Sequence, residues 1–395
     1  MPPPLVIWDE KMLGYDLGGH HPMHPLRLEL TWELADGLGV LDGVDLVSPQ
    51  PADDAVLCTV HTPGYLDAVR RASVAGGPEL PVGHGLGTTD NPTFEGMHEL
   101  SALIAGGSVQ AARAIADGRT NRAINLAGGL HHAMADHAAG FCIYNDAAMA
   151  IRALLDAGVQ RVAYVDIDVH HGDGVQAAFY GDHRLLTVSL HESPLTLWPG
   201  TGWPAEHGRG PAAGTSVNIP VPAGTGNAGW LRAFHAVVPG VVQAFRPEVL
   251  VTQHGADTHR EDPLADLNVS VDGQLAAHRA LRQLAENAAG GRWLALGGGG
   301  YALVRVVPRS WTHLLATVLD RDIDPRRPVP EDWTAHATAA RPHVAPPIDM
   351  TDGEPDGPTY SPWDGSSESA VDRAISQVRR LVYPLHGLDP HDPRD

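Results

Sequence analysis

The 395-residue chain has few cysteines, few basic residues and no long apolar run. Its two cysteines, Cys58 and Cys142, cannot build a disulfide framework or a Cys-based zinc site, so a reducing compartment fits. No basic-then-apolar leader precedes Leu5, and no apolar stretch reaches the roughly 18 residues that a membrane span needs. We therefore expect a cytoplasmic enzyme or binding protein that does not enter a membrane.

Positive charge is scarce: 27 Lys and Arg stand against 47 Asp and Glu, for a net charge of −20. This balance argues against direct nucleic-acid binding and favours cationic substrates through long-range steering, although simple solubility also explains it. Hydrophobic residues make up 43% and charged residues 19%, as is ordinary for a globular protein. The length allows one large α/β domain or two smaller ones.

Apolar runs and helical periodicities alternate along the chain. Short runs rich in β-branched residues predict strands at 5–8, 123–126, 162–169, 185–191, 216–221, 249–252 and 292–296. Helical spacing predicts helices from about residue 26 and at 100–117, 175–180, 227–245 and 274–289. Strand after strand is followed by His, Asp or Gly. We therefore expect an open, largely parallel sheet whose ligands bind beyond the carboxyl ends of the strands.

The segment RVAYVDIDVHHGDG, residues 161–174, is the centre of this pattern. In an extended strand Asp168 and His170 point the same way, with Asp166 one step further back. A carboxylate oxygen beside an imidazole nitrogen is half of a first-row metal site. The alternative is a polar strand end that caps a helix, but three Asp and two His within eight residues exceed what a cap needs.

Three other loops can complete such a site. Asp257, after the strand at 249–252, is the natural third metal ligand, although it is also a common turn or helix-cap residue. His131 and His132 follow the strand at 123–126, and adjacent imidazoles suit general acid and base catalysis, although pairs of histidines are more often structural. Tyr301 follows four glycines, which leave room for its phenol to enter the cleft.

Taken together, these motifs resemble the zinc-dependent histone deacetylase superfamily. The segments that carry the resemblance, in order between about residues 22 and 315, are GGLHHA, GFCIYND, YVDIDVHHGDGV, VSLH, PGTG, GAD and LGGGGY. These motifs are similar to those of class I members. Together with the ending RRLVYPLHGLDP, they look most like the bacterial acetoin utilisation branch, whose members deacetylate protein lysines. The resemblance implies the arginase-deacetylase fold, a three-layer αβα domain with an eight-stranded, mainly parallel sheet.

The resemblance also implies roles for the residues above. Zinc, with ferrous iron as the alternative, would be bound by Asp168, His170 and Asp257. His131 would pair with Asp166 and His132 with Asp173, with His132 as the preferred general base and acid. Tyr301 would donate a hydrogen bond to the acetyl oxygen.

Further residues follow from the same resemblance. Phe141 would line the acyl-lysine tunnel, with Gly140, Trp198 and Leu264 also contacting substrate, and Asp90 would hold the substrate backbone at the rim. Arg27 would lie at the acetate exit. A structural potassium ion would be bound by oxygens of Asp166, Asp168, His170, Ser189 and Leu190.

The chain departs from the family pattern in three places. Leu197 and Trp198 stand where relatives often have two aromatic residues before PGTG, which alters one tunnel wall. His254 replaces a residue that is often Cys before GAD. Gly172 stands where relatives with arginase activity have a further Asp, which disfavours a binuclear site.

Residues 1–320 are therefore expected to form a deacetylase catalytic domain. Residues 321–395 read as a Pro-rich, acidic arm with a final helix at about 367–382 that packs on the same domain. The expected reaction is metal-dependent hydrolysis of N-acetyl-lysine in proteins. The alternatives are deacetylation of acetylated polyamines and, from a different class, a non-catalytic acyl-lysine binding module; the oligomeric state stays open.

Overall fold

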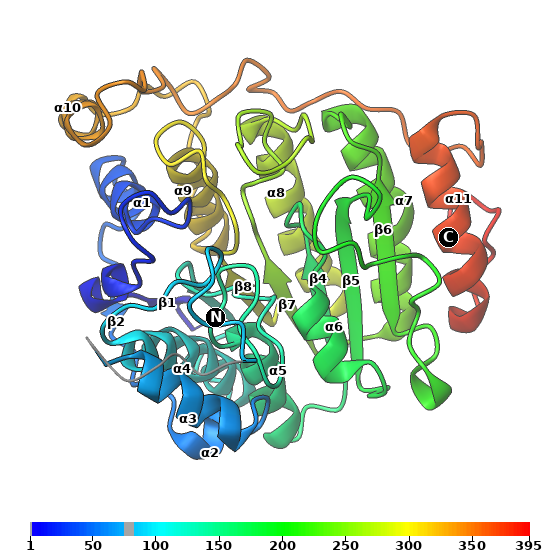
Figure 1. Cartoon of the computed structure of the whole chain (residues 1–395). Helices are drawn as coiled ribbons and strands as arrows, with labels where there is room; N and C mark the ends of the chain where they lie inside the picture. Colours follow the sequence, from blue (N-terminus) through cyan, green and yellow to red (C-terminus); the bar gives the residue numbers. More distant parts are fainter. Residues whose placement is uncertain (1, 75–82) are drawn as a thin grey trace.

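The computed structural model describes residues 2–74 and 83–395, and it is built on one eight-stranded sheet (Figure 1). The strand order is β2-β1-β3-β8-β7-β4-β5-β6, and every pair of neighbours runs parallel. The strands are β1 (Leu5–Ile7), β2 (Leu46–Val47), β3 (Arg122–Asn125), β4 (Val162–Asp166), β5 (Leu185–Glu192), β6 (Ser216–Val221), β7 (Val249–Gln253) and β8 (Trp293–Leu296). The predicted parallel α/β fold is confirmed.

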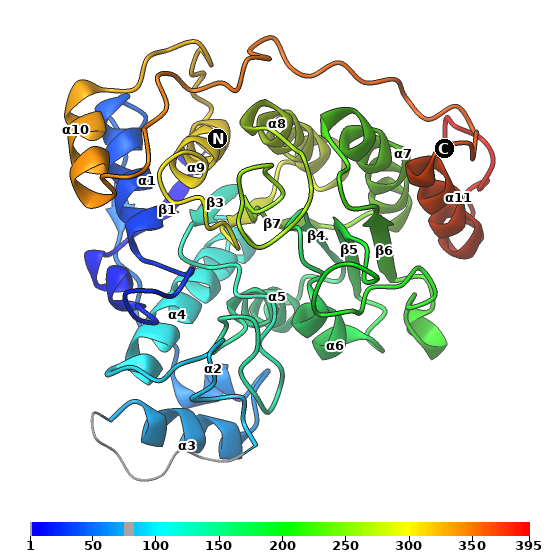
Figure 2. The same cartoon turned by 45° about the horizontal axis from the view of Figure 1, so that its top comes forward.

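Helices cover both faces of the sheet and form the outer two layers. They are α1 (Leu26–Gly37), α2 (Asp54–Leu57), α3 (Pro63–Ala72), α4 (Met97–Ala116), α5 (Asp146–Asp156), α6 (Asp173–Phe179), α7 (Asn227–Phe245), α8 (Val271–Ala288), α9 (Val307–Val318), α10 (Glu331–Ala340) and α11 (Ala370–Val382). Figure 2 shows α4, α5 and α6 on one side of the sheet and α1, α9, α8 and α7 on the other. Parallel strands covered on both faces must be apolar throughout, which is why they were readable from the sequence.

The central strand β4 is shorter than the sequence predicted. All five of its residues are buried, and it lies between β5 and β7 with Asp166 opposite both Ser189 and Gln253. The strand ends at Asp166, so Asp168 and His170 lie on the loop beyond it. Their common direction therefore comes from that loop and its partners, and the strand-alternation argument for it was wrong.

Several elements were not predicted from the sequence. The strand β2 has only two residues, too few for a periodicity. The helix α9 was missed although Val307, Trp311, Leu314, Leu315 and Val318 recur at helical spacing; every one of its residues is buried, the polar ones included. The helix α10 lies within the segment predicted as an extended arm; Pro330 stands at its N-cap, and Trp333 is buried and donates from Nε1 to the Leu30 carbonyl at 2.8 Å.

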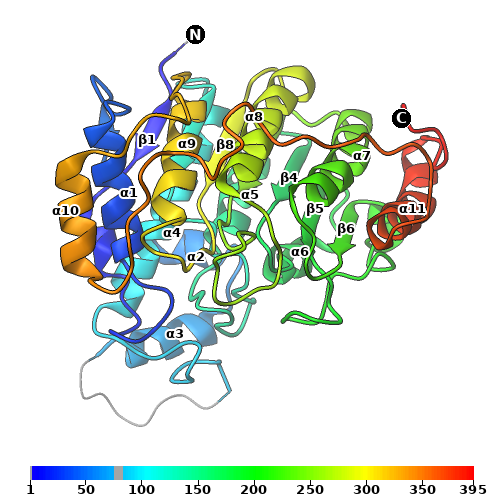
Figure 3. The same ribbon diagram turned by 90° about the horizontal axis from the view of Figure 1, so that it is seen from above.

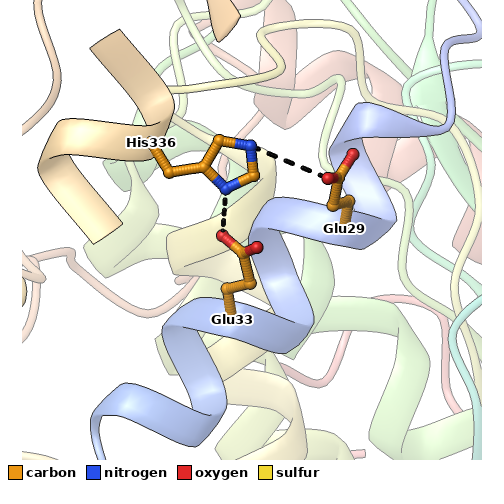
Figure 4. Close-up of side chains that lie close together, drawn as sticks. All are labelled: Glu29, Glu33 and His336. Carbon is orange, nitrogen blue, oxygen red and sulfur yellow. Dashed lines mark hydrogen bonds and ion pairs between the residues drawn. The ribbon is translucent and has the colours of Figure 1, made fainter. Parts of the chain in front are cut away.

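A second contact fastens α10 to α1 at the surface (Figure 4). The ring of His336 lies between two glutamates of α1, with Nδ1 2.6 Å from Glu33 Oε2 and Nε2 3.7 Å from Glu29 Oε1. The two ring nitrogens face separate carboxylates, so His336 joins α10 to α1. We refer to this contact of His336 with Glu29 and Glu33 as the His336 clasp. Together with Trp333 it fixes the position of α10 on the molecule.

The chain after α10 crosses to the opposite end of the molecule, where α11 packs on α7 and β6 (Figures 1 and 3). On the way it contacts the N-terminal ends of two helices: Thr351 donates to Asp272 of α8, and Glu354 accepts from Asn227 of α7. The predicted final helix is present as α11, whose N-cap Ser369 forms a capping box with Asp372. The domain boundary at residue 320 stays a prediction.

Across residues 2–74 and 83–395, no helix combines the length and apolar character required to cross a membrane.

The tail after α11 is anchored by one buried side chain, Arg379. Its guanidinium donates to the Ala236 carbonyl at 2.7 Å and to the carbonyls of Asp389, Pro390 and Asp392, and it lies 3.9 Å from the centre of the Tyr383 ring. The Ala236 carbonyl is buried and the three tail carbonyls are partly buried, so losing these charge-assisted hydrogen bonds is costly.

We predict that Arg379→Leu lowers the free energy of unfolding by about 2 to 4 kcal/mol, because the buried Ala236 carbonyl and three partly buried tail carbonyls lose their donor. Denaturant unfolding followed by circular dichroism measures this change. Arg380→Leu, at the exposed neighbouring position, is the matched control and should stay within about 0.5 kcal/mol of the parent. Equal effects of the two substitutions would show that Arg379 does not anchor the tail.

Candidate active site

The three predicted metal ligands converge at the carboxyl edge of the sheet. Asp168 and His170 come from the loop after β4 and Asp257 from the loop after β7, and one ligand atom of each lies within 4.8 Å of the others. The Nδ1 atom of His170 is 3.2 Å from Asp168 Oδ1 and 3.3 Å from Asp257 Oδ2. All three side chains are buried.

This donor set fits a divalent cation. The Oδ2 atom of Asp257 is buried and accepts no hydrogen bond from the described residues, so it is an orphaned anionic oxygen aimed into the site. Burial and the Asp168 carboxylate raise the pKa of Asp257 to about 6. Burial lowers the pKa of His170, but the nearby carboxylates of Asp168 and Asp257 outweigh this and raise it to about 10. The buried carboxylates of Asp168 and Asp257 thus need a positive charge between them, which a metal ion would supply.

The ligand Asp168 is oriented by groups from neighbouring strands. Its Oδ2 accepts from Gln253 Nε2 at 2.7 Å and from the Gly299 amide at 2.9 Å. The Val169 amide donates to Asp257 Oδ1 at 3.0 Å, which ties the two ligand loops together. Such outer contacts fix ligand geometry before a metal arrives.

The first predicted histidine–aspartate pair is present. His131 Nδ1 lies 2.7 Å from Asp166 Oδ2, which also accepts from the Tyr164 hydroxyl at 2.7 Å. Burial lowers the pKa of His131, but Asp166 and Asp168 outweigh it and raise the pKa to about 9. This imidazole is therefore protonated near neutral pH.

The second pair has the opposite character. His132 Nδ1 lies 2.7 Å from Asp173 Oδ1, yet burial and the neighbouring His131 lower the pKa of His132 to about 4. The two imidazole rings are 4.0 Å apart. With Nδ1 held by Asp173, neutral His132 leaves Nε2 as the nitrogen that can accept a proton.

Tyr301 follows the glycine run after β8. A Cβ on Gly299 would lie 2.0 Å from Asp257 Oδ2, so only glycine lets this loop pass the metal ligands. The Tyr301 amide donates to Asp262 Oδ2 at 2.8 Å. Burial and the carboxylates of Asp257 and Asp168 raise the pKa of the Tyr301 phenol, which therefore remains a hydrogen-bond donor.

Aromatic side chains border this group. The Phe141 ring lies 5.6 Å from the Tyr301 ring, edge to face, and the Trp198 ring lies 4.6 Å from that of His132. Phe141 has a φ of 68°, a conformation that the Tyr15 hydroxyl supports by donating to its carbonyl at 2.7 Å. A Cβ on Gly140 would lie 2.5 Å from the His132 ring, so Gly140 allows this part of the chain to approach His132.

The remaining predicted residues lie around this centre. Arg27 is buried behind the glycine loop, where it donates to the Gly298 carbonyl at 2.7 Å. The Asp90 carbonyl accepts from His21, whose ring lies 4.5 Å from Phe141, so Asp90 is connected to the rim. The Leu264 amide donates to Asp262 at 3.0 Å.

The predicted potassium ligands lie on β4 and β5 and on the loop after β4. Ser189 stands opposite Asp166 in the sheet, and Leu190 is the next residue of β5. The Ser189 hydroxyl is also 2.9 Å from His191 Nδ1. The potassium role of these residues stays a prediction.

Sequence reasoning missed three supporting residues. Gln253 orients Asp168, Asp262 holds the backbone of Tyr301, and Asp146 accepts from the amides of Gly129 and Leu130 ahead of the paired histidines. Gln253 and Asp146 stand within or beside motifs that were recognised, QHGAD and YND, so their position was an available signal.

A fourth support comes from the C-terminal segment. Asp352 Oδ2 is 2.7 Å from His259 Nε2, and Asp352 Oδ1 accepts from Arg309 at 2.8 Å. Burial raises the pKa of Asp352, but His259 and Arg309 outweigh it and hold the pKa below its usual range. Because His259 follows Asp257 by two residues, this contact steadies the loop that carries a ligand.

Comparison with known proteins gives consistent matches. The histone deacetylase domain family matches residues 21–318. The acetoin utilization protein AcuC of Bacillus subtilis (strain 168) is 39% identical over 333 residues, covering 83% of this chain and 85% of the relative. The AcuC of Staphylococcus aureus (strain MSSA476) is 36% identical over 319 residues, covering 80% and 82%.

Solved structures agree with these matches. A histone deacetylase homologue from Aquifex aeolicus has a TM-score of 0.83 at 28% identity, covering 96% of this chain and 100% of that one. A histone deacetylase homologue complexed with SAHA has a TM-score of 0.82. The family and branch predicted from the motifs are confirmed, and so is the arginase-deacetylase fold.

We predict that Gly299→Ala weakens metal binding about 10- to 100-fold, because the added methyl group would displace the Asp257 and Asp168 carboxylates. Titration of the metal-free protein with zinc against a competing chelator measures this affinity. Gly64→Ala, where a Cβ meets nothing within 4 Å, is the control and should bind one metal ion per chain as the parent does. Parental affinity in Gly299→Ala would contradict the assignment of the site.

Proposed function

Since this chain belongs to the histone deacetylase family, in its acetoin utilisation branch, we propose that it hydrolyses N-acetyl-lysine side chains of proteins to lysine and acetate. The observation that carries the proposal is the grouping of a neutral imidazole, His132, and a protonated phenol, Tyr301, around a buried Asp-His-Asp ligand set. Amide hydrolysis needs a proton acceptor for water, a donor for the carbonyl oxygen and an electrophile.

We propose zinc as the metal, with ferrous iron as the alternative, held by Asp168, His170 and Asp257. When bound, the ion would polarise the acetyl carbonyl and acidify a water molecule. His132 accepts the proton of that water at Nε2 while Asp173 keeps the ring oriented. The same imidazole then protonates the amine that leaves.

Tyr301 acts on the other side of the acetyl group. Its hydroxyl donates to the acetyl oxygen as this oxygen gains negative charge, so its effect is largest in the transition state. Phe141 and Trp198 supply an apolar passage for the four methylenes of the lysine chain, and the Gly140 backbone leaves the space between them and His132. Arg27, behind Gly298, is placed to attract the acetate product.

We also propose that a structural potassium ion binds where β4 and β5 lie beside the loop after β4. Backbone and side-chain oxygens of Asp166, Asp168, His170, Ser189 and Leu190 would bind it. The pairing of β4 with β5 supports this assignment, because it places Ser189 beside Asp166.

Acetylated polyamines are the second candidate substrate, favoured by the net charge of −20. A non-catalytic acyl-lysine binding module is the least supported alternative. A site that has lost catalysis usually lacks some of its reactive residues, whereas here both histidine–aspartate pairs, the ligand set and Tyr301 are all present.

The proposed reaction is tested by acetate release from acetyl-lysine peptides and from acetylspermidine, with and without a chelator. We expect turnover of the peptides, loss of it with the chelator, and recovery on adding zinc back. Faster hydrolysis of acetylspermidine at equal concentration would make the small amine the substrate. Binding of the peptide without any acetate release by the metal-loaded protein would favour the binding module.

Tyr301→Phe keeps the ring and removes one donor. We predict a fall in kcat of about 10²- to 10³-fold with little change in KM, because the lost hydrogen bond forms mainly in the transition state. Steady-state kinetics on one acetyl-lysine peptide measure this change, and elemental analysis checks that the metal content is unaltered. Near-parental kcat would mean that Tyr301 only packs the glycine loop.

A further inference from the structure

A pocket of about 280 Å³ adjoins the candidate active site on the outer side of Tyr301. One wall is the chain around Tyr301 and Arg305, after β8, and the other is the chain at Arg341 and Val344, after α10. Pro263 and Glu261, from the loop that carries Asp257, complete it. Three segments that are distant in sequence therefore meet beside a residue that the proposed reaction uses.

The charges in this pocket are unbalanced. Arg305 is neutralised by Glu261, with contacts of 2.7 and 3.2 Å, and it also donates to the Ala345 carbonyl at 3.1 Å. Arg341 is only partly exposed, and its guanidinium has no hydrogen bond or ion pair with any residue in the described part of the chain. Within the described part of the chain, the Arg341 guanidinium is thus a cation without a partner at this pocket, in a protein whose net charge is −20.

The position of Arg341 is fixed by the packing of α10. Arg341 is the C-cap of this helix, which the Trp333 indole and the His336 clasp fasten to α1 (Figure 4). The hydrogen bond from Arg305 to Ala345 ties the following segment to the loop after β8. The guanidinium is therefore attached to a preorganised wall, which reduces the entropy cost of binding a ligand.

We propose that this pocket is a substrate subsite for a carboxylate, and that it binds an aspartate or glutamate close to the acetyl-lysine in the substrate chain. A guanidinium recognises a carboxylate through two parallel hydrogen bonds, and the side chains of Val344 and Pro263 offer apolar contact to the methylene groups of an acidic side chain. Tyr301 lines this pocket and is also the proposed hydrogen-bond donor of the reaction centre. This inference rests on the proposed deacetylation of protein lysines and specifies which sequences are preferred.

The test uses the full-length, metal-loaded protein and a host peptide with one acetyl-lysine. Each of the three positions before and after this lysine carries Glu, Gln or Lys in turn. We expect Glu to lower KM about three- to tenfold relative to Gln at one or two positions, with kcat unchanged, because the contact holds the substrate and does not change in the transition state.

Variants of Arg341 separate recognition from structure. Arg341→Gln should remove the difference between the Glu and Gln peptides, Arg341→Lys should restore part of it, and Arg341→Glu should make the Lys peptide the preferred one. A merely structural role would not reverse a charge preference. Arg380→Gln, an exposed arginine on α11 at the opposite end of the molecule, is the matched control and should keep the parental kinetics and preference (Figure 3).

The outcomes distinguish the two proposals. Turnover of the Gln peptides with no preference for Glu at any position overturns the subsite and leaves the deacetylase activity standing. A Glu preference that survives in Arg341→Gln also overturns it. If the parent protein hydrolyses none of the peptides, the proposed activity on protein lysines fails, and the subsite fails with it.

Discussion

The burial of two carboxylates side by side is the constraint on which the rest of the structure depends. Asp168 and Asp257 are shielded from water and offer oxygens within 4.8 Å of each other, so at an effective dielectric constant of 20 their charges repel by roughly 3.5 kcal/mol. Backbone amides, Gln253 and the His170 ring offset part of this cost, yet Asp257 Oδ2 keeps no donor. Such an arrangement is stable only with a cation, or a proton, in place.

The same constraint explains how the surrounding loops are linked. The loop after β8 must pass within contact of both carboxylates, which requires Gly299, and its carbonyl accepts the Ala256 amide at 2.8 Å. The loop after β7 then brings Asp257 within 3.3 Å of His170 and Asp262 within 2.8 Å of the Tyr301 amide. A shift of this loop would move the proposed metal ligand Asp257 and the proposed hydrogen-bond donor Tyr301 together. The contact between Asp352 and His259 therefore makes the C-terminal segment part of the structure that supports the candidate active site.

Local patterns predicted what depends on local sequence. Strands buried on both faces, such as β4 and β7, are continuous apolar runs, and the polar residues that end them gave the ligands. The strand β2 could not be predicted because it is two residues long, whereas α9 was missed although its apolar residues follow helical spacing. The contact of Asp352 with His259 joins residues 93 positions apart, and no periodicity carries that information. Arg341 likewise became a candidate only once α10 had been placed against α1.

The division of labour between the two adjacent histidines also follows from packing rather than from sequence. Each ring contacts one aspartate at 2.7 Å, so the pairing alone predicts the same pKa for both histidines. Asp168 lies 3.9 Å from His131 Nε2, however, and this second carboxylate raises the pKa of His131 to about 9. The resulting positive charge, 4.0 Å away and in a dry environment, helps to lower the pKa of His132 to about 4. Between these two values one imidazole is charged and the other is neutral, which is the difference that the proposed role of His132 as proton acceptor requires.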